Sequence, residues 1–439
     1  MSSLISHAVV QIRTVQRQAA SLLLYQSVLK TPLGQAFLDL LEATHNSDTT
    51  GFKCLEAYSH WFSILASENV TWEDYLITQI LKDDNPFSRQ AQRMEFANLP
   101  AALVEAARHD LQMLQSIYHC RGEQISKLVR TVAQLSHPPI IWHLENQEIG
   151  FSPEFSLRHQ LKSLDNWGNV VEALAAYYRQ CGTGIFAQYK AFQWRGGELV
   201  GIAHPDPVQL TQLVGYESPR DTLIKNTEFL LAGYPALHVL LYGSRGSGKS
   251  SLVKALLNKY WEHNLRLIEV GKSDLKDLPL IVEQLRAVPQ KFIIFVDDLS
   301  FEEDDDAFKS LKVVLEGNVT ARPQNVVVYA TSNRRHLIRE FFEDRPRPKD
   351  SDEVHAWDTM QEKLSFSDRF GLTLTFEPAD QNTYLKIIRH LAHQEGINIS
   401  LDDLDYRALQ WATRHNGRSG RTARQFIDYL RAELGIVGQ

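Results

Sequence analysis

The sequence predicts an α/β fold in its second half, with a five-stranded parallel sheet and a helical C-terminal lid, preceded by a mainly helical N-terminal domain. Three observations support this prediction. Apolar residues recur at helical spacing through residues 1–135. From Val208 onward, short β-branched or aromatic runs alternate with helical stretches, the pattern of a parallel sheet covered on both faces. After Pro378 the strand candidates stop and amphipathic helices follow.

Composition limits the function only broadly. The chain has 439 residues, 44% of them hydrophobic, and a net charge of −7, which suits two or three globular domains. Neither half is basic enough to predict nucleic-acid binding from charge alone. The three cysteines lie far apart in sequence, which argues against a disulfide framework or zinc site and favours a reducing compartment, the cytoplasm.

The sequence predicts neither a membrane span nor a secretory signal. No apolar run approaches the roughly 18 residues that a span needs, and the first residues lack a positive segment with a small-residue cleavage site. An acid-poor, amphipathic beginning with Arg13 and Arg17 leaves a transit peptide as an alternative.

We expect four segments along the chain. Residues 1–190 form a mainly helical N-terminal domain, residues 191–207 a hairpin and a proline-stiffened linker, residues 208–377 an α/β domain, and residues 378–439 the helical lid. The five strands are predicted at His238–Tyr242, Arg266–Val270, Phe292–Val296, Val326–Thr331 and Leu372–Phe376.

A glycine-rich stretch, G-S-R-G-S-G-K-S, separates the first of these strands from a helix. Glycines let successive backbone N–H groups converge on phosphate oxygens, and the helix N-terminus adds a positive dipole. Lys249 is then expected to contact the outer phosphates and the Ser250 hydroxyl to bind Mg²⁺. The predicted nucleotide-binding residues are Gly243, Ser244, Arg245, Gly246, Ser247, Gly248, Lys249, Ser250 and Ser251.

Two carboxylates end the buried strand F-I-I-F-V, and ligands of parallel sheets bind at this edge. We expect Asp297 to assist Mg²⁺ coordination and Asp298 to orient or deprotonate the attacking water. The acidic run 302–306 has two interpretations. It adds metal or partner contacts, or, as we favour, it occupies the positive start of the helix 307–315.

Three further polar residues follow the same logic. Asn333, at the end of the next strand, is placed to bind a phosphate oxygen and the water. Arg369, before the last strand, is a candidate for contacting the γ-phosphate of a neighbouring subunit, and a salt bridge with Asp368 is its alternative. Arg421 lies just ahead of the last helix, whose start at Thr422 is predicted from a capping box with Gln425. A nucleic-acid patch is the weaker interpretation of this arginine-rich region, because no aromatic residues interleave.

Taken in this order, the motifs resemble those of AAA+ ATPases, over slightly more than half the chain. Leu213–Arg220 resembles the segment near adenine, Gly243–Ser250 the Walker A loop, Phe292–Asp298 Walker B, Asn333 sensor one, Arg369 the arginine finger and Arg421 sensor two. The stretches L-V-G-Y, D-D-L-S-F-E and S-D-R-F-G are most similar to a bacterial AAA+ group described only as a domain of unknown function. The resemblance implies ATP, Mg²⁺ and a homo-oligomer with active sites at subunit interfaces. Many members have Asp-Glu where this chain has Asp297-Asp298, so slower water activation, or activation by Glu302, follows as an alternative.

Two functions remain open at this point. The first is an ATPase that drives a conformational change in a partner or in its own N-terminal domain. The second is a weakly hydrolysing, ATP-gated adaptor or loader for a protein or nucleic-acid partner. A GTPase is disfavoured because no N-K-x-D motif follows, and a small-molecule kinase has no need of Arg369 and a separate lid.

Overall fold

The computed structural model describes residues 2–46, 51–144, 153–286, 288–300, 306–316, 323–333, 365–415 and 417–437. The chain divides into two compact units, Met1–Gln188 and Tyr189–Gln439. Among the described residues, no helix combines the length and the apolar character that a membrane crossing needs.

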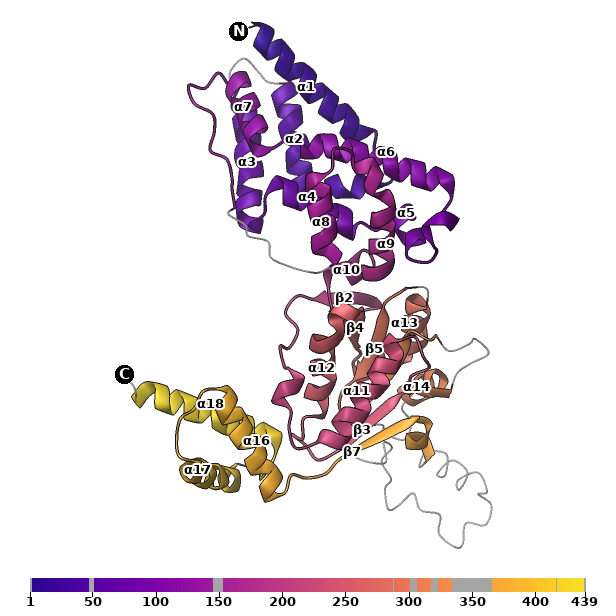
Figure 1. The fold of residues 1–439 in the computed structure, drawn as a ribbon, viewed down its shortest axis with the longest axis vertical. Coiled ribbons are helices and arrows are strands. Elements are labelled where there is room, and N and C mark those ends of the chain that lie inside the picture. The colour runs from indigo at the N-terminus through magenta and orange to yellow at the C-terminus, as the bar shows by residue number, and fades with distance from the viewer. Residues whose placement is uncertain are drawn as a thin grey trace. The chain divides into compact units, whose positions relative to one another are not determined.

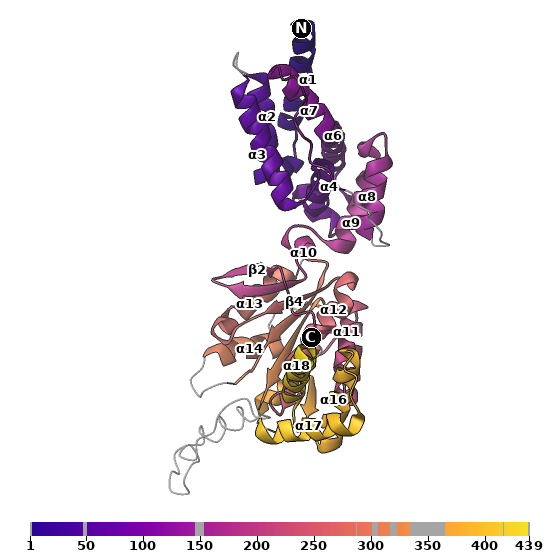
Figure 2. The same cartoon turned by 90° about the vertical axis from the view of Figure 1, so that its left-hand side faces the viewer.

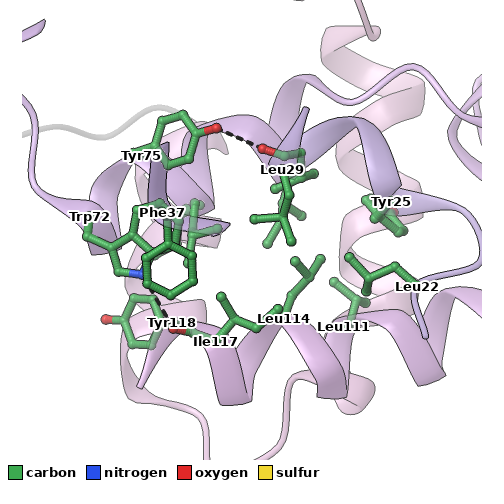
Figure 3. Close-up of a cluster of buried hydrophobic side chains, with 14 of the residues drawn as sticks. Leu22, Tyr25, Leu29, Phe37, Trp72, Tyr75, Leu111, Leu114, Ile117 and Tyr118 are labelled. Atoms are coloured by element: carbon green, nitrogen blue, oxygen red, sulfur yellow. Dashed lines mark hydrogen bonds between the residues drawn. The ribbon is translucent and has the colours of Figure 1, made fainter. Parts of the chain in front are cut away.

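The first unit is helical, as the apolar spacing predicted (Figure 1). Its core is rich in aromatic side chains: the rings of Phe37 and Trp72 stack with centroids 4.0 Å apart, and Trp72 donates a hydrogen bond to the carbonyl oxygen of Ile117 (Figure 3). Asp110 is fully buried, and its carboxylate accepts hydrogen bonds from three successive backbone N–H groups, residues 23–25. The helices are α1 Ser2–Ala20, α2 Pro32–His45, α3 Phe52–Glu68, α4 Trp72–Lys82, α5 Pro86–Ala91, α6 Ala101–Tyr118, α7 Gly122–Val132, α8 Pro153–Ser163, α9 Val171–Cys181 and α10 Ile185–Gln188.

The second unit is built on one sheet of seven strands, in the order β2-β1-β4-β5-β6-β3-β7. The five predicted strands are present and parallel, but the count of five was wrong because the predicted hairpin joins the same sheet, with β1 pairing parallel to β4 and antiparallel to β2. The strands are β1 Ala191–Arg195, β2 Glu198–Ile202, β3 Val239–Gly243, β4 Leu265–Glu269, β5 Lys291–Val296, β6 Val326–Ser332 and β7 Leu372–Phe376.

Helices cover both faces of this sheet. Figure 2 shows α11 (Glu217–Leu231) and α12 (Lys249–Tyr260) on one side of the strands, and α13 (Leu278–Leu285) and α14 (Asp306–Glu316) on the other. The burial of β5 is consistent with helices on both faces. Adjacent residues of this strand have side chains on opposite faces of the sheet, and both sets are inaccessible to solvent. The continuous apolar run of β5 is therefore explained by its central place in the sheet.

The lid consists of three helices with their own core, α16 (Gln381–Gln394), α17 (Leu401–Arg414) and α18 (Gly420–Val437). Their amphipathic stripes fix the packing, with Tyr384 and Ile388 of α16 fully buried. These are the amphipathic helices predicted after Pro378. The third begins two residues earlier than its predicted capping box.

Candidate functional site

The glycine-rich loop follows β3 and leads into α12, as predicted. Gly243 has a φ of 142°, and a Cβ atom on it would lie 1.9 Å from the carbonyl oxygen of Phe376 in β7. That oxygen accepts a 3.0 Å hydrogen bond from the backbone N–H of Ser244, so the loop is anchored to the neighbouring strand. Gly246 and Gly248 also have positive φ, 74° and 90°, which non-glycine residues rarely adopt.

Lys249 is 7% exposed and points back across the loop. Its Nζ donates to the carbonyl oxygens of Gly243 and Ser244 at 3.0 and 2.8 Å and lies 3.5 Å from Oδ1 of Asn333. Burial lowers the pKa of this ammonium group, and the nearby carboxylates of Asp297 and Asp298 oppose the shift. A desolvated cation of this kind interacts strongly with an anion such as a phosphate.

The two carboxylates after β5 meet the loop at its helix end. Ser250 Oγ donates a 2.6 Å hydrogen bond to Oδ1 of Asp297, which also accepts one from the hydroxyl of Thr331. The same Thr331 hydroxyl accepts a 2.9 Å hydrogen bond from the backbone N–H of Asp298, whose φ is +50°. Thr331 thus holds both aspartates in place, a role missed at the sequence level because a threonine at a strand end is common.

These oxygens suit Mg²⁺, which prefers hard oxygen ligands and is usually held by one or two carboxylates, waters and substrate phosphates. The described residues contain no group of three or more His, Cys, Asp or Glu side chains arranged for a metal. A hydroxyl and a carboxylate at the mouth of a phosphate loop are the donor set for a metal that arrives with its nucleotide.

Asn333 lies at the end of β6, which is paired with both β3 and β5. Its Nδ2 donates a 2.6 Å hydrogen bond to Oδ1 of Asp298. Its Oδ1 faces Lys249, so the amide joins the phosphate loop to the second carboxylate, where the sequence predicted a water-orienting amide.

The lid contributes cations from the other side. The backbone N–H of Arg421 donates to the carbonyl oxygen of Gly246 at 3.1 Å, so the lid touches the phosphate loop directly. The predicted start of α18 was wrong: the helix begins at Gly420, because Ser419 accepts the hydrogen bond from Thr422 N–H and so caps it. Arg421 therefore lies inside the first turn. Arg424 forms an ion pair with Glu395 at 3.0 Å.

Between the sheet and the lid lies a cavity of about 850 Å³, lined by loop residues 245–251, both aspartates, Asn333 and Arg421. Gly243 and Ser244 are not among its lining residues. Its lining also includes the apolar side chains of Ile387 and Leu391 of α16. The predicted adenine segment contributes as well, and Tyr216 donates a 2.9 Å hydrogen bond to the carbonyl oxygen of Glu377. The residues that line the cavity include Asp206, Pro207, Val208, Leu213, Val214, Tyr216, Arg245, Gly246, Ser247, Gly248, Lys249, Ser250, Ser251, Asp297, Asp298, Thr331, Asn333, Arg421 and Arg424.

Arg369 is not among the residues that line this cavity. It ends the short 3₁₀ helix Ser365–Arg369 before β7, and its guanidinium forms an ion pair with Glu316 at the end of α14. The side chain is 17% exposed. This carboxylate lies 53 positions earlier in the chain, which sequence spacing does not reveal.

The predicted acidic run 302–306, with Glu302, lies outside the described residues except for Asp306, at which α14 begins.

Comparison with known proteins gives a family and a set of structures. A family model described as a protein of unknown function, DUF815, matches residues 187–434. A search of curated proteins found no match. Among solved structures, the chain is similar to the RuvB Holliday junction branch migration motor of Thermotoga maritima, with 17% identity and a TM-score of 0.37 over 53% of this chain and 67% of that one. A point mutant of the same motor matches with 17% identity and a TM-score of 0.38, over 53% and 68%.

Proposed function

Because this chain belongs to the DUF815 family of proteins of unknown function and has the AAA+ fold, we propose that it is a Mg²⁺-dependent ATPase. Hydrolysis at subunit interfaces of a homo-oligomer then drives a conformational change in a protein partner or in its own N-terminal unit. Cytoplasmic localisation is part of the proposal, because the three cysteines, which all lie in described parts of the chain, form no disulfide, and this fits a reducing compartment.

One observation carries the proposal: the loop lysine, the hydroxyl–carboxylate pair and the amide–carboxylate pair converge in a single cavity. Lys249 links to Asn333 at 3.5 Å, Asn333 to Asp298 at 2.6 Å, and Ser250 to Asp297 at 2.6 Å. A structural glycine turn has no need for this set of groups. Phosphoryl transfer needs all of them, because its catalysis consists mainly of positioning and charge stabilisation.

Each group has a distinct proposed role. The loop N–H groups, Arg245 and Lys249 bind the phosphates, and Ser250 and Asp297 hold Mg²⁺, which neutralises charge on the phosphate oxygens when bound. Asp298 accepts the proton of the attacking water, and Asn333 fixes that carboxylate and faces the transferred group. The exposed Arg421 adds positive charge from the lid.

Arg369 is proposed to act on the nucleotide of a neighbouring subunit. Its side chain is not among the residues that line the cavity of its own chain. Arg369 precedes the start of β7, whereas Phe376, which anchors the glycine-rich loop, ends that strand. In trans, it would supply a cation to the γ-phosphate, an effect worth roughly 10³–10⁵ in rate where it occurs.

A weakly hydrolysing, ATP-gated adaptor is the second candidate, and one observation favours it. Asp298 is one methylene shorter than glutamate, and its Oδ1 is engaged by Asn333, so the carboxylate is less free to reach water. This alternative retains the same nucleotide site and differs in turnover.

Steady-state ATPase measurements separate the two functions. The ATPase proposal predicts turnover that falls at least about 100-fold in Lys249→Ala and in Arg369→Ala. Lys259→Gln, on the exposed side of α12, is the matched lysine control and should retain the wild-type rate. A rate that neither Lys249→Ala nor Arg369→Ala changes would refute the ATPase and leave the adaptor.

A further inference from the structure

The cavity lining includes Asp206, Pro207 and Val208, which lie between β2 and the 3₁₀ helix Leu210–Gln212 and belong to no helix or strand. The sequence placed Asp206 and Pro207 in a linker and Val208 at the start of the α/β domain. They form one part of the cavity wall, to which Leu213 and Val214 also contribute. Something outside this segment must fix it if the wall is to have a defined shape.

Asn258 of α12 supplies that support. Its Nδ2 donates hydrogen bonds to the carbonyl oxygens of Asp206 and Val208, both at 2.8 Å. Its Oδ1 accepts a 3.2 Å hydrogen bond from Nζ of Lys190, immediately before β1. Asn258 itself does not line the cavity.

The three partners determine how this amide is oriented. A flipped amide would set Oδ1 against two carbonyl oxygens and Nδ2 against an ammonium group, losing all three hydrogen bonds. Lys254, one turn earlier in α12, adds an ion pair to Asp206 at 3.6 Å. The wall segment is therefore attached to the same helix that begins at Lys249.

This attachment has a geometric consequence. Helix α12 starts at the phosphate loop and carries Asn258 nine residues later, so one rigid element sets the separation between the phosphate end of the cavity and the wall at 206–208. A ligand that contacts both ends depends on that separation. A ligand that contacts only the phosphate end does not.

We propose that Asn258 is a positioning residue for nucleotide binding, which holds the wall at residues 206–208 against the base and ribose while leaving the phosphate end untouched. This inference rests on the proposed function, since it takes ATP as the ligand. It concerns selectivity for a whole nucleotide over its phosphate chain.

The test compares Mg²⁺–ATP with Mg²⁺–tripolyphosphate, which carries the phosphates without base or ribose. Asn258→Asp keeps the size and the acceptor for Lys190 but replaces both donors with a carboxylate oxygen that faces carbonyls. Two lost hydrogen bonds predict an ATP Kd about tenfold weaker or more, with the Kd of tripolyphosphate changed less than about twofold. Asn258→Ala provides a second variant if the aspartate chain does not fold, and Lys259→Gln is the control on the same helix.

The outcomes divide cleanly. A selective loss of ATP affinity in a folded Asn258 variant supports the inference. Three results would overturn it. The variants could lose equal affinity for both ligands, they could keep the wild-type Kd for ATP, or the wild-type chain could bind ATP but show no measurable binding of tripolyphosphate. If the wild-type chain does not bind ATP, both the proposed function and this inference fail. That result is distinct from the others because it is obtained without any variant.

Discussion

Nδ2 of Asn333 donates a 2.6 Å hydrogen bond to Oδ1 of Asp298, joining the ends of the adjacent strands β6 and β5. The amide therefore fixes the orientation of the carboxylate that we assign to water activation. The first aspartate is held differently, by the hydroxyls of Ser250 and Thr331. Two carboxylates next to each other in sequence thus have different partners, which predicts different consequences of their loss.

Asp298→Asn should abolish hydrolysis while sparing binding. Loss of the proton acceptor predicts a turnover lower by roughly 10²-fold or more, with a Kd for ATP within about threefold of wild type, because Asp297 and Lys249 remain. Steady-state rates and equilibrium binding on the same preparation check this. Asp402→Asn, an exposed aspartate in the lid, is the control; equal losses of binding and turnover would contradict the assignment.

The Asp298→Asn variant held in ATP should also retain its partner in affinity capture.

The proposed trans action of Arg369 predicts complementation. Arg369→Ala and Lys249→Ala chains should each be inactive, and their mixture should regain part of the activity because one intact composite site forms between them. ATPase rates of the mixture against each chain alone measure this. Folded, co-assembled chains that fail to complement would count against trans action. Glu316→Gln, which removes the carboxylate that Arg369 contacts within its own chain, should leave the complementation intact.

Gly243→Ala should destabilise the fold and remove nucleotide binding together. The added Cβ would lie 1.9 Å from a backbone oxygen of β7, at a φ of 142°, so we expect a loss above about 3 kcal/mol, from strain plus a clash that cannot relax. Gly396→Ala is the matched control: its φ is also positive, at 67°, but a Cβ there meets nothing within 4 Å. Its cost should be about 1–2 kcal/mol. Chemical denaturation of both variants provides the comparison, and equal costs would contradict the close approach of β3 and β7.

A salt bridge between α11 and the lid should be visible in a titration. Glu217 accepts a 2.6 Å hydrogen bond from Nζ of Lys386 and another from the backbone N–H of Gly215, which lower its pKa to about 2. Because this folded-state pKa lies below the unfolded one, the stabilisation is complete above the unfolded pKa near 4.3 and is lost as the pH falls toward 2. Both side chains are exposed, so its size is at most about 1 kcal/mol.

Carboxyl NMR titration of Glu217 checks this directly. In Lys386→Met the pKa should rise toward its ordinary value, while the wild-type value stays low. A wild-type pKa near 4.3 would show that the contact is not maintained in solution. Added salt should also raise the wild-type pKa, since screening weakens an exposed pair.

The sequence predicted the local features of this fold well, for a physical reason. The central strands are short runs of β-branched and aromatic residues buried on both faces, and motifs at their carboxyl ends must meet at one edge of a parallel sheet. The positions of Asp297, Asp298 and Asn333 follow from that rule, and so does the phosphate loop. These predictions do not depend on which strands are neighbours in the sheet.

Long-range contacts account for what the sequence missed. The sequence pattern of the hairpin 191–202 is the same whether the hairpin stands alone or extends a sheet. Its pairing with β4 makes it part of the seven-stranded sheet. The ion pair between Arg369 and Glu316 and the hydrogen bonds of Asn258 to residues 206 and 208 join positions with no periodic relation. The start of α18 was mispredicted because Ser419 and Thr422 both have side chains able to cap a helix.

Direct measurement of ATP binding tests the central claim, that the residues from Gly243 to Ser250 bind a triphosphate whose Mg²⁺ is held with Asp297. Isothermal titration calorimetry of the wild-type chain with ATP and Mg²⁺ should give saturable binding, weakened at least about 100-fold in Lys249→Ala and, with Mg²⁺ chelated, reduced in the wild-type chain. Folded wild-type chain with no detectable affinity for ATP in the presence of Mg²⁺, or with an affinity that Lys249→Ala leaves unchanged, would contradict the account.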